Sequence, residues 1–424
     1  MTLTMLIFAI VLLIRVPIAI VLGIAGLVLL FVSGNGDMLI NSPQRLFSSL
    51  ESYSLLAIPL FMLAGEIMNT GGITSRLVNF AQKFVGHFRG GLAYVNIVAN
   101  TFLASIIGSA AAQIAMMTKI MVPAMEKEGY KREFGAATTA AAGMLGPIIP
   151  PSMLFIIYGA TAGTSIGDMF LAGIIPGILL SLSFIILVAY LGYKQSFPSK
   201  PKASWGERGK SLFKIIPALL VPGILIWGIV TGVFTPTESA GIACVIALVV
   251  GLFIYRELDF KKLPGIMVNT AISTSIVTLL IAMANIFGWA MTFERVPQAI
   301  AEWMTTISDN PFVFLILVNV LFLMLGMLVE GIALIIILTP IFVPILPAFN
   351  IDPIQFGVII CLNVVIGILT PPVGSGLFLA TSLGKVSIES FVKAVLPFVL
   401  VSIIVLLLVT FIPEITMWIP SLSK

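Results

Sequence analysis

Two proline-rich breaks carry most of the polar chemistry of this sequence. Gly146-Pro147-Ile148-Ile149-Pro150-Pro151-Ser152 interrupts an apolar run from Ala136 to Ala162, and Thr370-Pro371-Pro372-Val373-Gly374-Ser375-Gly376 interrupts a later run. Proline removes a backbone donor and clashes with the preceding turn, so neither stretch can continue an α-helix. Broken backbone at membrane depth persists only where protein or a water-filled cavity satisfies its polar groups. Both breaks are therefore candidate binding sites.

Two more polar positions lie between paired apolar segments. Gly108-Ser109 separates Leu92–Ile107 from Ala110–Met125, and Gly326 to Glu330 separates Phe312–Leu325 from Gly331–Leu346. Carbonyl and hydroxyl oxygens at such tips suit a hard cation such as Na⁺, while half-helix N-termini attract anions. An alternative is that glycine and serine here only allow close helix packing. Four breaks in equivalent positions favour ion and substrate binding.

Acidic residues are scarce in the apolar runs, and Glu330 is the strongest candidate among them. An acid inside a membrane protein is costly and usually functional. Glu330 can neutralise a cation or, when protonated, donate to a substrate; the alternative is an acid that only caps a wet hairpin tip. Glu66 and Glu238 are expected to cap or pack. His87 is the single histidine, which excludes a histidine metal cage or proton relay.

The composition is that of an all-α polytopic membrane protein. Of 424 residues 59% are hydrophobic and 9% are charged, and the mean hydropathy is +1.16. Soluble domains carry about 25% charged residues. Cys244 and Cys361 lie in apolar runs and are expected to be small buried residues without a disulfide. The net charge of +4 lies in loops and indicates no nucleic-acid partner.

The elements that must position the breaks can be read along the chain. Two stretches are amphipathic or polar and are expected to lie along the membrane interface, Ile73–Phe88 and Glu294–Ile307. The expected full spans are Leu3–Ile14, Ile18–Val32, Ser54–Met68, Met169–Tyr190, Leu212–Phe234, Ser239–Tyr255, Gly265–Met291 and Phe391–Phe411, together with the two broken runs. Thr235-Pro236-Thr237-Glu238 is typical of a helix start.

The sequence contains an internal repeat. At an offset of 221 positions the pair Pro150-Pro151 falls on Pro371-Pro372 without a gap. Further coincidences at this offset are Thr118 with Thr339, Pro123 with Pro344, Gly146 with Gly367, Gly163 with Gly384, Phe170 with Phe391, and Pro176 with Pro397. Ser109 falls opposite Glu330. Such self-similarity indicates two structurally equivalent halves.

Basic residues orient the two halves in opposite directions. Lys194–Lys214 and Arg256–Lys262 are separated by two spans and are both expected on the cytoplasmic side. Basic residues also flank both ends of the first hairpin, whereas no Lys or Arg occurs from Val313 to Ile351 around the second. The hairpins are therefore expected to be re-entrant from opposite faces. With an even number of full crossings, both termini are expected to be periplasmic, and Arg15 cytoplasmic.

These patterns divide the chain into two copies of one plan. Residues 1–70 are expected to be scaffold helices, 71–90 an interfacial arm, and 91–194 a transport domain with the first hairpin and first broken helix. In the second copy, 195–292 are expected to be a cytoplasmic loop and scaffold helices, 293–309 an arm, and 310–424 the second half of the transport domain.

Other function classes fit the sequence less well. An intramembrane enzyme needs a nucleophile–base pair, paired acids or a metal motif, and the sequence has none of these. A channel needs a continuous polar pore, whereas the polar positions here gather at two central breaks and two tips. A stand-alone Na⁺/dicarboxylate or citrate-type symporter remains the alternative, since it can share the inverted-hairpin plan.

The full length of the chain resembles the large membrane subunit of tripartite ATP-independent periplasmic (TRAP) transporters. The resemblance is carried by Gly108-Ser109-Ala110-Ala111-Ala112, Gly143 to Ser152, Thr235-Pro236-Thr237-Glu238 and Leu369-Thr370-Pro371-Pro372-Val373-Gly374. It implies an elevator-type fold and Na⁺-driven import of organic acids into bacteria across the inner membrane, with no cofactor other than the coupling ion.

The resemblance also implies site residues. One Na⁺ site is expected where Ser105, Gly108 and Ser109 meet Gly146 and Pro147, and another where Gly326 and Glu330 meet Thr370, Pro371 and Gly374. The candidate substrate contacts are Ser109, Pro150, Ser152, Glu330, Gly374 and Ser375.

The implied partners are a small four-helix membrane subunit and a periplasmic substrate-binding protein. The sequence contains no additional four-helix segment, so the small subunit is expected to be a separate chain. Likeness to the sialic-acid branch favours N-acetylneuraminate as substrate, with C4-dicarboxylates as the alternative. No arginine lies in the expected central site, so helix N-termini and hydroxyls are expected to hold the carboxylate.

Overall fold

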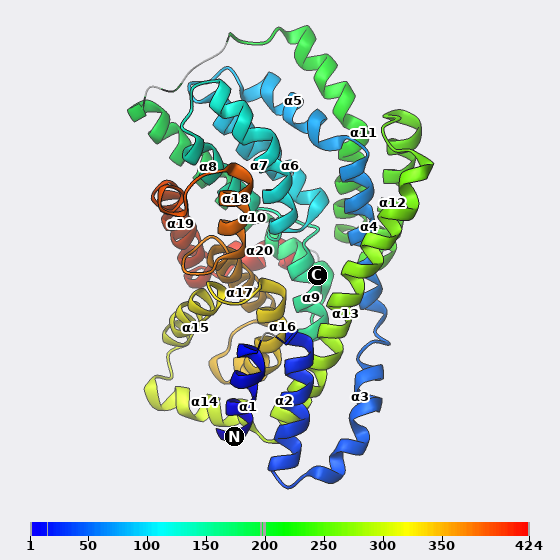
Figure 1. The fold of residues 1–424 in the computed structure, drawn as a ribbon, viewed down its shortest axis with the longest axis vertical. Coiled ribbons are helices and arrows are strands. Elements are labelled where there is room, and N and C mark those ends of the chain that lie inside the picture. Colours follow the sequence, from blue (N-terminus) through cyan, green and yellow to red (C-terminus); the bar gives the residue numbers. More distant parts are fainter. Residues whose placement is uncertain (1, 15, 196, 198–200, 423–424) are drawn as a thin grey trace.

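The computed structural model describes residues 2–14, 16–195, 197 and 201–422 and places most of them in α-helices, with no strand among them (Figure 1). The first half contains α1 (Thr2–Leu13), α2 (Ile18–Val32), α3 (Ser42–Ser48), α4 (Ala57–Thr70), α5 (Ile73–Val85), α6 (Gly91–Ile107), α7 (Ala110–Lys127), α8 (Arg132–Gly143), α9 (Met153–Ala162) and α10 (Ile166–Gln195). The second half contains α11 (Trp205–Val230), α12 (Pro236–Val249), α13 (Leu263–Phe293), α14 (Val296–Ile307), α15 (Pro311–Gly326), α16 (Gly331–Phe342), α17 (Pro353–Gly367), α18 (Ser375–Gly384), α19 (Ile388–Phe411) and α20 (Glu414–Leu422).

Each half contains one helical hairpin and one broken helix, as predicted. The hairpins are α6–α7 and α15–α16, and the broken helices are α8–α9 and α17–α18. The first hairpin follows α5 and the second follows α14, and these two arm helices lie at opposite ends of the molecule (Figure 1). The hairpins therefore enter the molecule from opposite ends, which confirms the inverted repeat.

Equivalent helices of the two halves pack in exchanged pairs. Helix α2 packs along α13, and its counterpart α12 packs along α4. In the same way α9 packs against α16 of the second hairpin, while α18 packs against α7 of the first. Contacts between the halves therefore bring both hairpins and both broken helices into one central layer. This arrangement follows from the repeat, because the broken helix of each half packs against the hairpin of the other half.

The helices before the two breaks form the most deeply buried part of the molecule. Every residue of α8 from Phe134 to Gly143 is buried, and so is every residue of α17 from Ile354 to Gly367. A helix that is apolar on all sides belongs in the interior of a membrane protein. The run of alanine, threonine and glycine in α8 also lets neighbouring helices approach closely.

The arms and caps agree with the sequence, apart from their ends. Helix α5 ends at Val85, where Gly86 closes it, and not at the predicted Phe88. Helix α14 begins at Val296, two residues after the predicted Glu294, and ends at Ile307 as predicted. Thr235 and Glu238 form a reciprocal capping box at the start of α12, with Pro236 in the first turn. Helix α10 extends three residues earlier than predicted and continues to Gln195. The short helices α3 and α20 were not predicted, because each has fewer than ten residues.

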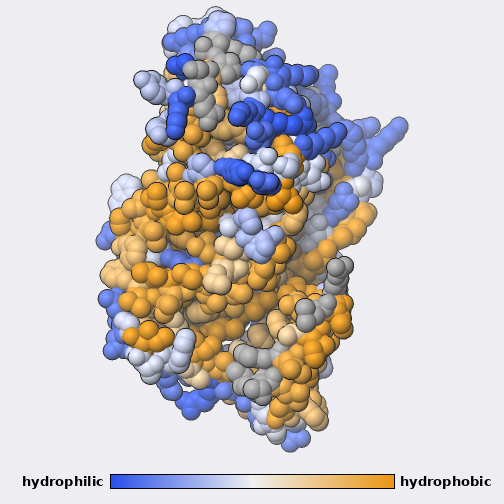
Figure 2. All heavy atoms as spheres, turned by 60° about the vertical axis from the view of Figure 1, so that its left-hand side comes forward, coloured by the Kyte–Doolittle hydropathy of each residue, from blue (hydrophilic) through white to orange (hydrophobic). Residues whose placement is uncertain are grey.

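Among the described residues seven helical stretches are long and apolar enough to cross a membrane. Six of them correspond to predicted spans, and the seventh is Gly331–Phe349 in the second hairpin. Helices α1 and α2 have 12 and 15 residues, fewer than the roughly 20 that a perpendicular span needs. Arg15 lies outside the described residues, and the orientation of the termini stays a prediction. Figure 2 shows a broad hydrophobic band with hydrophilic side chains gathered at the ends of the molecule.

Candidate ion and substrate site

The tip of the first hairpin rests directly on the first break. Gly108 closes α6 with a φ of +63°, a conformation that favours glycine. Its carbonyl accepts a hydrogen bond of 3.3 Å from the amide of Met153, the first residue of α9. A Cβ at position 108 would lie 2.9 Å from the carbonyl oxygen of Pro151. Glycine is therefore required both by the turn and by the close contact.

The first break is held by a serine. Ser152 accepts a hydrogen bond of 3.3 Å from the amide of Phe155 and donates its hydroxyl proton to the carbonyl of Pro147. It therefore caps α9 and also satisfies a carbonyl that the prolines leave without a helical donor. The Pro150-Pro151 peptide is cis, as is Pro371-Pro372. Ser152 is fully buried, so it holds the break together and does not face the cavity described below.

The second hairpin meets the second break in the same manner. The amides of Val373 and Gly374 donate to the carbonyl of Met327 at 3.2 and 3.1 Å. Gly326 lies against Gly367, and a Cβ at position 367 would lie 2.6 Å from the carbonyl carbon of Gly326. In both halves, an amide just after the cis proline pair thus donates to a hairpin carbonyl.

The two tips differ in length. The last residues of α6 and α15, Ile107 and Gly326, are 219 positions apart, whereas the first residues of α7 and α16, Ala110 and Gly331, are 221 positions apart. The second tip therefore has two more residues than the first. At the equivalent N-cap positions stand Ser109 and Glu330, as the offset of 221 predicts.

A cavity of about 70 Å³ lies between the two tips. Among the predicted site residues it is lined by Gly108, Ser109, Pro147, Glu330 and Ser375, which come from both hairpins, the first break and the start of α18. It has room for a few water-sized species. The other predicted residues, which are Ser105, Gly146, Pro150, Ser152, Gly326, Thr370, Pro371 and Gly374, do not line this cavity.

The two breaks lie in different surroundings. Pro150 and Pro151 are buried beneath α10 and α11, where they contact a small apolar space that Phe170 and Leu225 also line. Pro371 and Pro372 are exposed, as is Val373. Thr370 is half-buried, and its hydroxyl donates to the carbonyl of Ile366 at 2.9 Å. The halves are therefore equivalent in sequence position but not in environment.

Glu330 caps the second arm of its hairpin. Its carboxylate accepts a hydrogen bond of 3.2 Å from the amide of Ala333, in the first turn of α16. The residue also lines the central cavity and is exposed there. The capping interpretation is thus observed. It leaves an ion or substrate role open, because a carboxylate has further acceptor positions.

A chain of buried amide side chains beside the first tip was not predicted from the sequence. Gln113 donates to both oxygens of Asn100, at 2.7 and 2.8 Å, Asn100 donates to Asn96, and Asn96 donates to Thr139 of α8 at 2.7 Å. The Oε1 atom of Gln113 is buried without a partner, and a Cβ at Gly146 would lie 2.7 Å from it. The signal was present as amide side chains inside apolar runs.

The second half has a related network. Asn363 of α17 donates to Asn319 at 2.7 Å, and Asn319 donates to the hydroxyl of Thr410 at 3.0 Å. Asn319 follows Asn100 by 219 positions, the offset of the first hairpin arms. Each hairpin is therefore tied to the core by an asparagine in the same place.

An arginine lies in a separate cleft, which the later turns of α9 and α16 help to line. Arg45 of α3 stacks over the ring of Trp289, 5.3 Å from its centroid, in a cleft of about 290 Å³. The cleft also has hydroxyl and amide groups from Thr161 and Asn285. It lies between α3 and α13 on one side and α9 and α16 on the other. The position of Arg45 was not predicted, because α3 was not predicted.

The donor atoms near the first predicted Na⁺ site indicate whether an alkali cation can bind there. No cluster of His, Cys, Asp or Glu among the described residues could hold a transition metal. The first site offers neutral oxygens, namely the Ser109 carbonyl and the unpaired Gln113 Oε1, both close to Gly146. Neutral oxygens suit an alkali cation that must bind and leave. The residues at the first site therefore fit the ion.

The fold matches that of known transporters. The transporter YdaH of Alcanivorax borkumensis superposes with a TM-score of 0.67 at 14% sequence identity, covering 91% of this chain and 89% of that one. At this identity the similarity establishes the architecture of helices and no more.

Sequence comparison establishes the family. The family described as the tripartite ATP-independent periplasmic transporter, DctM component, matches residues 5–415. The sialic acid TRAP transporter large permease protein SiaM of Vibrio cholerae is 39% identical over 379 residues, which are 89% of each chain. The C4-dicarboxylate TRAP transporter large permease protein DctM of Pseudomonas aeruginosa is 38% identical over 89% of this chain and 88% of its own.

A longer relative shows the same segment within a larger protein. The sialic acid TRAP transporter permease protein SiaT of Haemophilus influenzae is 37% identical over 99% of this chain but only 68% of its own length. The match of nearly the whole chain to one family, together with the transporter fold, identifies the class of protein. The chain belongs to the tripartite ATP-independent periplasmic transporter family, as its large permease (DctM) component.

Proposed function

We propose that this large permease couples the import of an organic acid to Na⁺, by an elevator movement of the hairpins and broken helices. The family itself consists of secondary transporters of organic acids, which work with a small membrane subunit and a periplasmic binding protein. The observation that carries the proposal is the cavity between Ser109, Glu330 and Ser375, where both tips and both halves meet.

Na⁺ is favoured over a proton as the coupling ion by the groups that surround the tips. A proton-coupled carrier needs titratable groups along its path. Glu330 is the one acid that lines the central cavity among the described residues. The other polar side chains of the lining are the neutral hydroxyls of Ser109 and Ser375. Beside the first tip, Gln113 Oε1 has no hydrogen-bond partner that would compete with a cation.

The substrate we favour is N-acetylneuraminate, with a C4-dicarboxylate as the alternative. Relatives named for both substrates match this chain at nearly equal identity, so the overall match does not decide between them. The central cavity of about 70 Å³ is too small for either acid, and we propose that the cleft with Arg45 widens to admit the carboxylate. Thermal-shift measurements on the cognate binding protein with both acids test this choice. Stabilisation by the dicarboxylate alone would reverse it.

We further propose that the small subunit is a separate chain which meets the scaffold helices α1, α2, α4 and α11–α13. The longer relative SiaT supports the alternative that such a segment can be joined to the permease. A stand-alone symporter is the second function to exclude. If the purified chain takes up organic acids without any binding protein, the stand-alone function is correct.

The Na⁺ proposal is tested by removing one hydroxyl at each site. Ser109→Ala and Thr370→Ala should each raise the Na⁺ concentration for half-maximal uptake in proteoliposomes about fivefold, because one neutral oxygen contact is worth about 1 kcal/mol. The fold should survive, since both residues lie at polar breaks and not in packed apolar layers.

A matched control is Ser275→Ala, which removes an exposed hydroxyl from α13. Its Na⁺ dependence should equal that of the wild type. Full uptake on a pH gradient in the absence of Na⁺ would show that the ion is wrongly assigned, and Glu330 would then be the first residue to examine.

A further inference from the structure

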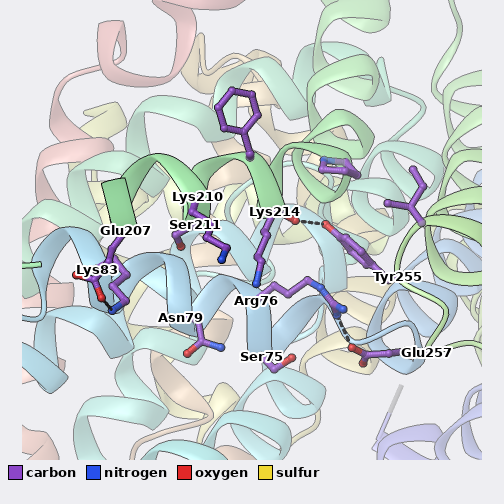
Figure 3. A pocket seen from close by; sticks show the side chains of 13 residues that line it. Ser75, Arg76, Asn79, Lys83, Glu207, Lys210, Ser211, Lys214, Tyr255 and Glu257 are labelled. Atoms are coloured by element: carbon purple, nitrogen blue, oxygen red, sulfur yellow. Dashed lines mark hydrogen bonds and ion pairs between the residues drawn. The ribbon is translucent and has the colours of Figure 1, made fainter. Parts of the chain in front are cut away.

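A large cleft lies outside the hairpin site, between the arm helix α5 and the first turns of α11 (Figure 3). Its volume is about 830 Å³, and Ile254, Tyr255 and Glu257, which follow α12 in the chain, close a third side. Four basic side chains and two acidic ones line it, namely Arg76, Lys83, Lys210, Lys214, Glu207 and Glu257. This volume falls in the usual range of small-molecule sites.

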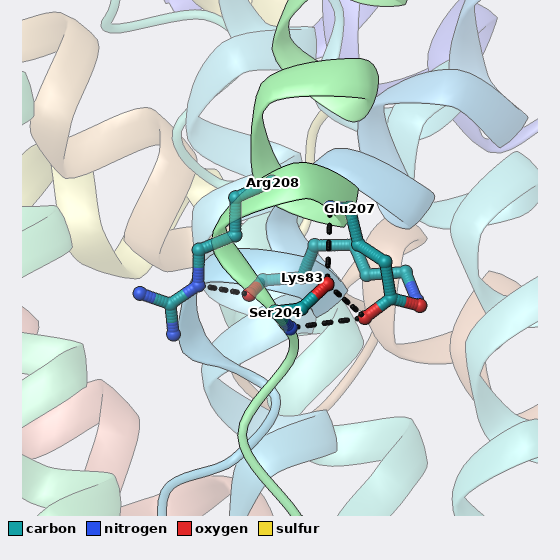
Figure 4. A network of polar contacts seen from close by, with 4 residues as sticks. All are labelled: Lys83, Ser204, Glu207 and Arg208. Carbon is teal, nitrogen blue, oxygen red and sulfur yellow. Dashed lines mark hydrogen bonds and ion pairs between the residues drawn. The ribbon is translucent and has the colours of Figure 1, made fainter.

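One end of the cleft is closed by contacts between α5 and the start of α11 (Figure 4). Lys83 forms an ion pair of 2.8 Å with Glu207, and Arg208 donates to the carbonyl of Lys83 at 3.2 Å. Glu207 also completes a capping box with Ser204. The first turn of α11 is therefore fixed on the arm helix, and the Glu207 carboxylate is already paired.

The other end is closed by an aromatic corner. Arg76 forms an ion pair of 2.6 Å with Glu257, and its guanidinium lies 3.9 Å from the ring centroid of Tyr255. The Tyr255 hydroxyl donates to the carbonyl of Lys214 at 2.8 Å. The second carboxylate of the cleft is thus paired as well.

The middle of the cleft keeps unpaired positive charge. Lys210 and Lys214 lie one turn apart on α11 and are both exposed. Neither ammonium group has an acidic partner within the part of the chain that the structure describes. Figure 3 shows them between the two closed ends, together with Asn79 of α5 and Ser211. These groups present hydrogen-bond donors to an anion.

The lining of the cleft continues into a membrane-facing surface. Phe213, which is 76% exposed, and Ile254 line the cleft beside the lysines. Further along α11 the exposed side chains are apolar, as at Ile216 and Leu220. An occupant that is anionic at one end and apolar at the other fits this gradient better than a free anion does.

We propose that the α5–α11 cleft binds the headgroup of an anionic phospholipid, whose acyl chains lie along α11. The basic residues place this end of the molecule at the cytoplasmic face. Anionic lipids of that leaflet attract basic residues, and basic pockets between membrane helices bind their headgroups. Lys210 and Lys214 bind the phosphate, and Asn79 and Ser211 add neutral hydrogen bonds.

The test compares lipid binding by the full-length wild-type protein with lipid binding by the full-length double variant Lys210→Gln/Lys214→Gln. Phosphatidylglycerol added in detergent should raise the melting temperature of the wild type, and phosphatidylcholine should not. Native mass spectrometry should show phosphatidylglycerol retained by the wild type. Each lysine near an anionic headgroup is worth about fivefold in affinity, so the double variant should bind phosphatidylglycerol on the order of 25-fold more weakly.

Two variants control for charge and folding. Lys210→Arg/Lys214→Arg keeps the charge and should keep the lipid. Lys127→Gln/Lys131→Gln removes two exposed lysines that do not line the cleft and should bind phosphatidylglycerol like the wild type. Equal binding by both Gln pairs would overturn the proposal.

Two other outcomes would also overturn it. Inorganic phosphate that stabilises the wild type as strongly as phosphatidylglycerol, with the same dependence on Lys210 and Lys214, would identify a free-anion site. Loss of a co-purifying subunit from the Lys210→Gln/Lys214→Gln variant, with lipid binding unchanged, would identify the cleft as a protein interface.

Discussion

Glu330 stands where the chemistry of the two hairpin tips differs. Its counterpart Ser109 is also an N-cap residue, but Ser109 makes no side-chain capping bond, whereas Glu330 accepts the amide of Ala333. Capping needs only an oxygen acceptor, which serine can also supply. A carboxyl group is therefore more than the cap requires, and its remaining oxygen is available to the cavity that both residues line.

Glu330→Ser separates these two roles. The serine should keep the N-cap. The free energy of unfolding should therefore stay within about 1 kcal/mol of the wild-type value. Loss of the charge should raise the Na⁺ requirement for uptake, as measured in proteoliposomes. Glu330→Ala, which loses both cap and charge, provides the comparison. If Glu330→Ser transports at wild-type Na⁺ concentrations, the carboxylate is only a cap.

At the scale of single residues, the polar residues at the breaks could be predicted from the sequence, but those inside the helices could not. Ser109 and Glu330 were found because polar residues at a break are conspicuous among apolar ones. Gln113, Asn100 and Asn319 are also polar within apolar runs, but their role depends on which helix they face. That direction is set by packing between α6, α7, α8 and the second half, which the local sequence does not contain.

At the scale of elements, the close approach of α15 and α17 is the most demanding contact. Gly326 and Gly367 touch backbone to backbone. The repeat places Gly367 at the position equivalent to Gly146. It does not predict the contact of Gly367 with Gly326, because the second tip is longer than the first. Proline and glycine determined the breaks locally, and this is why the hairpins and broken helices could be predicted. Helices α3 and α20 are short and depend on neighbours that are distant in sequence.

Gly367→Ala tests this contact. Its Cβ would lie 2.6 Å from the carbonyl carbon of Gly326, and backbone cannot rotate away as a side chain can. The cost should reach or exceed the upper part of the range of about 1–3 kcal/mol for overpacking. Thermal melting in detergent measures it. Gly223→Ala on α11 is the control, because a Cβ there meets nothing within 4 Å, and it should melt at or slightly above the wild type. Equal melting of both variants would show that α15 and α17 can separate freely.

At the scale of the whole molecule, the elevator proposal requires α16 to move against α13. A Cβ at Gly288 of α13 would lie 2.8 Å from the Cβ of Pro340 of α16, so a shift of about 1 Å between the helices would bring this pair to the roughly 3.8 Å of a disulfide. Gly288→Cys/Pro340→Cys should therefore cross-link on oxidation, and uptake should fall to background and recover on reduction. Both native cysteines are buried.

The control joins two helices that are predicted to move together. Gly23→Cys in α2 and Met283→Cys in α13 would place their Cβ atoms 3.8 Å apart. Cross-linking this pair should leave uptake unchanged. Full uptake with the first pair cross-linked would mean that α13 and α16 stay together during transport.

The unequal surroundings of the two proline pairs bear on the elevator movement that we propose. Pro150-Pro151 is covered by α10 and α11, whereas Pro371-Pro372 is exposed. Because the halves follow one plan in opposite directions, exchanging their conformations yields an arrangement related by a pseudo-two-fold rotation, with contacts of the same kind. In that arrangement we expect Pro371-Pro372 to be covered, with α1 in the place of α11, and Pro150-Pro151 to be exposed. The two end states then differ little in free energy, so the cargo and its ion gradient can decide the direction of travel.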